Sequence, residues 1–97
     1  MKTIVVRYKV KPERLVEHLS LIDGVFVALG EAKPGGLSYE VLRLEDGVSF
    51  IHTATVASEA NPLLALEEFR KFTADIKSRC DEPPVSSVAT VVHAYST

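Results

Sequence analysis

The chain has 97 residues, of which 46% are hydrophobic, and 11 basic against 13 acidic side chains give it a net charge of −2. This length suits a single domain over residues 1–97, and the acidic balance argues against a nucleic-acid-binding protein, which would need a basic stripe. No apolar run reaches the roughly 20 residues of a membrane span and no secretory signal opens the chain, so we expect a cytoplasmic protein with no membrane partner.

The N-terminal third predicts a strand followed by a helix. Residues Thr3 to Val10, TIVVRYKV, alternate between apolar and polar side chains, which is typical of a strand with one apolar face. Pro12 suits the first position of a helix, and Glu13 favours the positive end of the helix dipole. The apolar residues at helical spacing that would face a core are Leu15, Leu19, Ile22, Phe26 and Leu29. Gly30 and the KPGG segment should end this helix.

The central segment predicts a β-hairpin. Leu37–Leu44 and Val48–Val56 are strand-like, and the Asp-Gly pair at 46–47 favours a two-residue type I′ turn. That turn places Val41 opposite His52, whereas a three-residue turn with a bulge would shift the register by one and exchange the two faces. In the register that we favour, one face of the hairpin carries Tyr39, Val41, Phe50, His52 and Val56.

The C-terminal third predicts a second helix and a fourth strand. Residues 59–80 form the helix, with Asn61 as its N-cap. Its inner stripe would consist of Leu66, Phe69, Phe72 or Thr73, Ile76 and Cys80. Asp81 to Pro84 should stop the helix, and Val85–Tyr95 should form the strand. The resulting order predicts an α+β, ferredoxin-like β-α-β-β-α-β protomer with a four-stranded antiparallel sheet and both helices on one face.

The second face of this sheet predicts a homodimer. It would carry Arg7, Glu40, Leu42, Ile51, Thr53 and Thr55. That surface is too apolar to remain in water and too polar for an ordinary core. Pairing with the same face of a second copy would cover it, so we expect the chain itself as the partner, in a dimeric α+β barrel.

Several short motifs resemble the antibiotic biosynthesis monooxygenase family. The segment PGGLSYEV looks like the start of the family's second strand, Pro-Gly-x-x-x-Tyr. VKPER resembles its junction between first strand and first helix, and FRKFTADI is similar to the end of its second helix. The likeness covers nearly the whole chain in layout. It implies a dimeric α+β barrel of about this length, with a pocket between sheet and helices in each protomer.

The resemblance also implies a function. Members include oxygenases of phenols and quinols that need no cofactor, so the implied activity is a cofactor-independent monooxygenase acting on a small aromatic or quinol. The chain departs from the family at the end of its third strand, where Ala54 and Val56 replace the usual Glu-x-Trp. Leu63 and Glu68 stand near positions where the family often has histidines, and there is no tryptophan. These departures argue against the haem-degrading branch.

Candidate catalytic residues lie on the face expected to meet the helices. His52 is either a base that takes a proton from a phenol or enol, or a core imidazole hydrogen-bonded to a backbone or tyrosine oxygen. Tyr39 either orients a substrate or packs as a core aromatic. The residues expected to line the pocket are Tyr8, Phe50, Phe69 and Phe72.

The remaining polar residues predict no second kind of site. The three histidines are far apart in the sequence, with His18 at the boundary of the first helix stripe and His93 at the interface or in solvent. Their spacing indicates no metal site, and no phosphate-binding glycine motif occurs, so we expect no metal and no cofactor. Cys80, the single cysteine, is expected to be a buried structural thiol. The alternative to an enzyme is a non-catalytic dimeric domain that binds a small ligand or stabilises an assembly.

Overall fold

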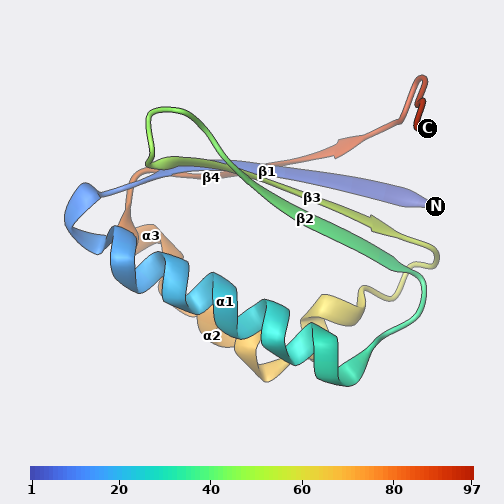
Figure 1. The fold of residues 1–97 in the computed structure, drawn as a ribbon, viewed down its shortest axis with the longest axis horizontal. Coiled ribbons are helices and arrows are strands. Elements are labelled where there is room, and N and C mark those ends of the chain that lie inside the picture. The colour runs from blue at the N-terminus through green and yellow to red at the C-terminus, as the bar shows by residue number, and fades with distance from the viewer.

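The computed structural model describes all 97 residues and places every helix on one face of a four-stranded antiparallel sheet (Figure 1). The strands are β1 (Lys2–Val10), β2 (Leu37–Arg43), β3 (Ser49–Val56) and β4 (Cys80–Ala89), in the order β2-β3-β1-β4. The helices are α1 (Leu15–Ala32), α2 (Glu67–Ala74) and α3 (Ile76–Arg79), with short 3-10 turns η1 (Pro12–Arg14) and η2 (Pro62–Ala65). The predicted α+β, ferredoxin-like fold is confirmed.

The pairing of β2 with β3 has the predicted register, but the turn that joins them differs. Val41 lies opposite His52, as expected. A type I′ turn needs positive φ at both central residues, and only Gly47 has it, at 81°. Asp46 instead accepts hydrogen bonds from the backbone N–H of Ser49 at 2.8 Å and from its hydroxyl at 2.5 Å. The Asp46 side chain therefore holds the start of β3.

The second helix is broken into three pieces, contrary to the single helix predicted over residues 59–80. Leu66 has an extended backbone, with φ −84° and ψ 127°, and separates η2 from α2. Asp75 separates α2 from α3 with φ −129° and ψ 26°, a conformation that is neither helical nor extended. The predicted cap is present, since the Asn61 side chain accepts from the N–H of Leu63 at 3.0 Å. Leu63, which the expected stripe omitted, is buried in η2.

The fourth strand starts five residues earlier than predicted and ends at Ala89 rather than Tyr95. Pro83 and Pro84 lie inside it instead of stopping a helix. β4 tolerates the two prolines because it is an edge strand. At the edge of a sheet, a missing N–H can fall on the side that faces solvent, where no hydrogen bond between strands is lost. Cys80 is buried as expected, but on β4 rather than on a helix stripe.

The core lies between the sheet and the helices, and the other sheet face is uncovered within the chain. The buried cluster consists of Tyr8, Val10, Val25, Phe50, Phe72 and Cys80. On the far face, one cross-strand row runs through Leu42, Ile51, Arg7 and Val85. Leu42 and Val85 in that row are exposed large hydrophobics. None of the helices has the length and apolar character needed to span a bilayer.

Candidate functional site

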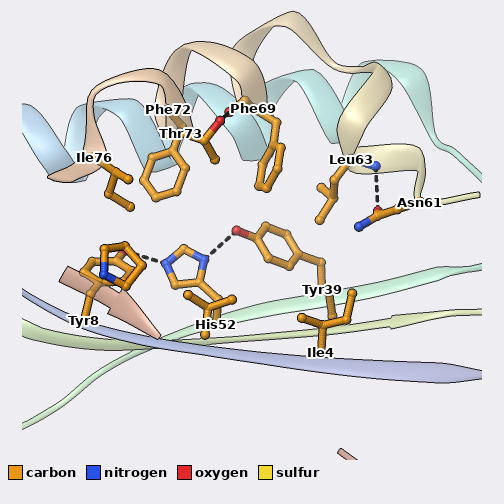
Figure 2. A pocket seen from close by; sticks show the side chains of 13 residues that line it. Ile4, Tyr8, Tyr39, His52, Asn61, Leu63, Phe69, Phe72, Thr73 and Ile76 are labelled. Carbon is orange, nitrogen blue, oxygen red and sulfur yellow. Dashed lines mark hydrogen bonds between the residues drawn. The ribbon is translucent and has the colours of Figure 1, made fainter. Parts of the chain in front are cut away.

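A cavity of about 150 Å³ lies between the inner sheet face and the helical segment η2–α2–α3 (Figure 2). Nine of its 13 lining residues are hydrophobic. The 13 lining residues come from all four strands and from the helical segment that faces them. They are Ile4, Val6, Tyr8, Tyr39, His52, Ala54, Asn61, Leu63, Phe69, Phe72, Thr73, Ile76 and Pro84. Thr73 is exposed, so the cavity has a rim at the protein surface. A small apolar pocket with few polar groups is the usual form of a small-molecule site.

His52 is the central polar group of this cavity. It lies on β3 with its side chain toward the helices, and it is only 6% exposed. Its Nε2 lies 2.5 Å from the hydroxyl of Tyr8, and its Nδ1 lies 2.6 Å from the hydroxyl of Tyr39 (Figure 2). The ring of Phe72 covers it from the helix side, with centroids 5.5 Å apart. His52 thus both lines the cavity and makes the tyrosine contact expected of a core imidazole.

His18 extends the polar network beneath the cavity, although the sequence placed it at the boundary of the apolar stripe of α1. It is completely buried, because α1 turns this position toward the sheet. Its Nε2 lies 2.6 Å from the Tyr8 hydroxyl. The Tyr8 oxygen therefore joins two histidines that are 34 residues apart in the chain.

Arg79 ends the network and was missed by the sequence analysis. It lies at the end of α3 and is 1% exposed. Its Nε donates to Nδ1 of His18 at 3.2 Å, one terminal nitrogen donates to the carbonyl of Phe72, and the guanidinium lies 5.5 Å from the centroid of the Phe72 ring. The available signal was its spacing of three residues from Ile76 and seven from Phe72, which puts all three on one helix face. From the sequence alone, an arginine at such a position is expected to be exposed to solvent, because arginine is rarely buried.

Burial shifts the acid–base properties of the whole network. Desolvation, with a smaller contribution from the positive charge of Arg79, lowers the pKa of His18 to about 4. Desolvation, with a smaller contribution from His18, lowers the pKa of His52 to about 4. The pKa values of Tyr8 and Tyr39 are raised well above that of a free phenol, chiefly by desolvation. Near neutral pH both histidines are therefore neutral and both tyrosines are protonated.

Five of the six predicted site residues meet at the cavity. Tyr8, Tyr39 and His52 contribute polar groups to it, and Phe69 and Phe72 contribute aromatic walls. Phe50 does not line it. Phe50 is buried in the core behind Tyr8, with the two rings stacked at 5.6 Å between centroids.

Elsewhere the polar residues do not gather into a second centre. No three side chains of histidine, cysteine, aspartate or glutamate come together as a set of metal ligands. Burial raises the pKa of the Cys80 thiol, which disfavours the reactive thiolate. His93 follows the end of β4 and is exposed.

No protein-family model and no curated protein matches the chain. Several solved structures share its fold. Rv0793 from Mycobacterium tuberculosis is 15% identical, with 98% of each chain covered and a TM-score of 0.76. A structure described as an antibiotic biosynthesis monooxygenase is 15% identical over 96% of this chain and 100% of that chain, with a TM-score of 0.75.

A third solved structure is SnoaB, a cofactor-independent oxygenase from Streptomyces nogalater. It is 18% identical over 96% of this chain and 94% of that chain, with a TM-score of 0.70. At these identities the likeness establishes the fold and leaves the substrate and the activity open. The fold resemblance expected from the short motifs, to antibiotic biosynthesis monooxygenases, is confirmed.

Proposed function

We propose that the chain is a cofactor-independent monooxygenase-like enzyme acting on a small aromatic or quinol substrate. The observation that carries this proposal is the apolar cavity of about 150 Å³ with the hydrogen-bonded pair His52 and Tyr39 in its wall. An apolar cavity of about this volume accommodates one benzene ring. The proposed substrate is therefore a single-ring phenol or quinol, or the reactive ring of a molecule that extends past the rim at Thr73. The fold shared with SnoaB supports the reaction type.

The proposed reaction needs no external reductant, because the substrate supplies all the electrons. The anion of a phenol gives one electron to O₂, and the two radicals combine to form a carbon–oxygen bond. The resulting peroxide anion takes up a proton equivalent to the one that the phenol lost. The hydroperoxide then loses water as its O–O bond breaks and the ring C–H proton leaves. One oxygen atom stays on the ring as a carbonyl and the other departs in water. The balance is phenol plus O₂ to quinone plus water, or quinol plus O₂ to hydroxyquinone plus water.

The roles of His52 and Tyr39 depend on the direction of the hydrogen bond between them. If Tyr39 donates to Nδ1, His52 is the base, and the substrate proton reaches it through the Tyr39 hydroxyl. If Nδ1–H donates to Tyr39, the tyrosine hydrogen is free to bind the substrate oxygen. Both arrangements put the substrate oxygen at the Tyr39 hydroxyl and the ring among Phe69, Phe72 and Leu63.

The proposed enzyme is a homodimer that closes through the uncovered sheet faces. The row of Leu42, Ile51, Arg7 and Val85 crosses all four strands and exposes the apolar side chains of Leu42 and Val85 beside the charged Arg7. Beyond β4 the chain leaves the sheet on the side away from the helices (Figure 1), where a second copy would lie. Such pairing would remove this surface from water and complete the proposed barrel.

A non-catalytic ligand-binding or structural domain is the second candidate. The observation that favours it is the complete satisfaction of the buried polar side chains, since none of them lacks a hydrogen-bond partner. Fully satisfied polar networks often serve to specify one packing of a core.

Oxygen consumption distinguishes the two candidates. Wild-type protein, His52→Ala and the exposed control His93→Ala would each be mixed with a panel of single-ring phenols and quinols in an oxygen electrode. The oxygenase predicts uptake by wild type and the control and loss of uptake in His52→Ala. Uptake that is equal in wild type and His52→Ala overturns it. A thermal-shift screen of the same panel identifies ligands first, because a tight binder raises the melting temperature.

A further inference from the structure

Five polar side chains from five different elements form one continuous chain of hydrogen bonds beneath the cavity. The chain runs Arg79, His18, Tyr8, His52, Tyr39, and the successive donor–acceptor distances are 3.2, 2.6, 2.5 and 2.6 Å. Its first member is fully enclosed, and its last member lines the cavity. The order of donors and acceptors along this chain is fixed by the chemistry of one end, Arg79.

Arginine sets the order because a guanidinium can only donate. Nδ1 of His18 must therefore accept from Arg79, and the single hydrogen of the neutral imidazole must sit on Nε2. That hydrogen points at the Tyr8 oxygen, so the Tyr8 hydroxyl must donate its own hydrogen onward to Nε2 of His52. His52 then carries its hydrogen on Nδ1 and donates to Tyr39. In the reverse order Nδ1 of His18 would carry the hydrogen. Two donors, Nδ1–H of His18 and Nε–H of Arg79, would then face each other with no acceptor between them.

We infer that Arg79, acting through His18 and Tyr8, holds His52 in its Nδ1–H form, so that Tyr39 offers its hydroxyl hydrogen to a substrate oxygen and the cavity selects ionised phenols and quinols. This inference rests on the proposed function and narrows its substrate class. His52 is then a positioning residue rather than the base. The Tyr39 hydroxyl has no other hydrogen-bond partner in the protein, so its hydrogen is available.

The charge of Arg79 supports an anionic substrate. None of the ion pairs of the chain includes Arg79, although the residue is buried. A buried charge with no carboxylate in contact is costly, and an anion nearby reduces that cost. The guanidinium lies against the ring of Phe72, and Phe72 also lines the cavity. A phenolate oxygen at Tyr39 would lie at the opposite end of a donor chain that begins at this charge.

The titratable groups around His52 agree with this assignment. Tyr8 faces it from β1, Tyr39 from β2 and His18 from α1, while Arg79 acts from α3 and Glu17 lies near His18. No carboxylate contacts either imidazole. The pKa of each histidine is lowered by burial, so neither becomes an imidazolium with two hydrogens near neutral pH. The substrate hydroxyl therefore loses its proton to solvent before the anion binds.

The tautomers of the two histidines test the inference in the wild-type protein. Protein labelled with ¹⁵N at histidine would be examined by long-range ¹⁵N–¹H NMR at pH 7, with His52→Gln and His93→Gln used to assign the signals. We expect His18 as the Nε2–H form and His52 as the Nδ1–H form. A His52 signal of the Nε2–H form or of the imidazolium overturns the inference.

Two substitutions at Arg79 test whether this residue sets the direction of the hydrogen bonds along the chain from Arg79 to Tyr39. Arg79→Lys keeps a group that can only donate, whereas Arg79→Met keeps the length and removes the donor. We expect the wild-type tautomers in the lysine variant and a mixture of His18 and His52 tautomers in the methionine variant. Unchanged tautomers in a folded Arg79→Met protein would show that Arg79 does not set the order. If that variant fails to fold, the wild-type spectrum still decides the direction.

Ligand binding tests the selection of anions. 4-Nitrophenol absorbs strongly in the visible only as its anion, so one titration reports both binding and ionisation. We expect its affinity for wild type to rise with pH through its own ionisation and the bound form to show the phenolate band. Preferential binding of the neutral phenol overturns the inference. Neither this result nor the tautomers depend on oxygen uptake, so loss of the proposed oxygenase activity alone would leave the inference standing.

Discussion

The hydroxyl of Tyr39 lies 2.6 Å from Nδ1 of His52, although the two residues are not partners in the β2–β3 ladder. Tyr39 pairs with Ala54, and His52 pairs with Val41, so the contact runs diagonally along one sheet face. Diagonal neighbours are within reach of aromatic side chains. A register shift of one residue would send one member of the pair to the far face. The candidate site therefore depends on the register of this hairpin.

Removing the Tyr39 hydroxyl should keep the binding of the substrate ring but remove the hydrogen bond to the substrate oxygen. In Tyr39→Phe the aromatic wall remains, but the substrate oxygen loses its donor, and we expect oxygen uptake to fall about a hundredfold or more. The Nδ1–H of His52 loses its acceptor, which should lower the free energy of unfolding by about 1–3 kcal/mol. Oxygen uptake and urea denaturation measure the two effects. The matched control is Tyr95→Phe, which should change neither, because Tyr95 is 90% exposed.

The buried histidines should make the protein less stable in acid. The pKa values of His18 and His52 fall from 6.5 to about 4 on folding, so between these values the unfolded chain binds protons that the folded chain does not. Their stabilising contribution is complete above about pH 6.5 and is lost as the pH falls toward 4. Each histidine contributes a slope of at most about 1.4 kcal/mol per pH unit.

Urea midpoints measured across this pH range check the slope. A folded His52→Gln variant should show about half of the wild-type dependence, because only His18 then resists protonation. His93→Gln should keep the full dependence, since that residue is exposed. A midpoint that does not change between pH 4 and 6.5 would contradict the burial of neutral imidazoles.

The sheet and its inner face could be predicted because alternation repeats every two residues along β1 and β3. The Asp-Gly pair at 46–47 also gave the correct register, even though the turn is held by the Asp46 side chain rather than by type I′ geometry. One residue of the pair, Gly47, has the positive φ that any tight connection here needs. The position of His52 at the cavity followed from that register.

The remaining part of the site could not be predicted because it depends on tertiary contacts of charged and polar residues. In the sequence His18 lies at the boundary of a helix stripe and Arg79 looks like a solvated helix position, yet both are buried with a hydrogen bond between them. The break at Leu66 has no glycine or proline to mark it. The sequence did not predict that β4 starts at Cys80, because Pro83 and Pro84 usually end a helix or a strand. Prolines are compatible with an edge strand, but only the structure shows that β4 lies at the edge of the sheet.

A charge placed on the uncovered sheet face should break the proposed dimer. Ile51 lies in the centre of the row that crosses this face, on β3 between β2 and β1. We expect Ile51→Glu to shift the mass in light scattering from that of two chains to that of one, because apposed carboxylates would be desolvated and would repel each other. Val16→Glu, on an 83% exposed position of α1, is the control and should keep the wild-type mass. A wild-type protein with the mass of one chain at micromolar concentration would contradict the proposed assembly.

Filling the cavity should abolish ligand binding while the hydrogen-bond chain stays intact. Ala54 is a buried lining residue on β3, two residues from His52, and a leucine there would occupy much of the roughly 150 Å³ between the sheet and the helices. We expect Ala54→Leu to lose the thermal shift produced by any phenol that stabilises wild type, and to lose oxygen uptake with it. Overpacking should cost about 1–3 kcal/mol of stability. The matched control is Ala74→Leu, at the exposed end of α2, which should keep both the thermal shift and the uptake. Persistent binding in a folded Ala54→Leu protein would mean that the ligand sits outside this cavity.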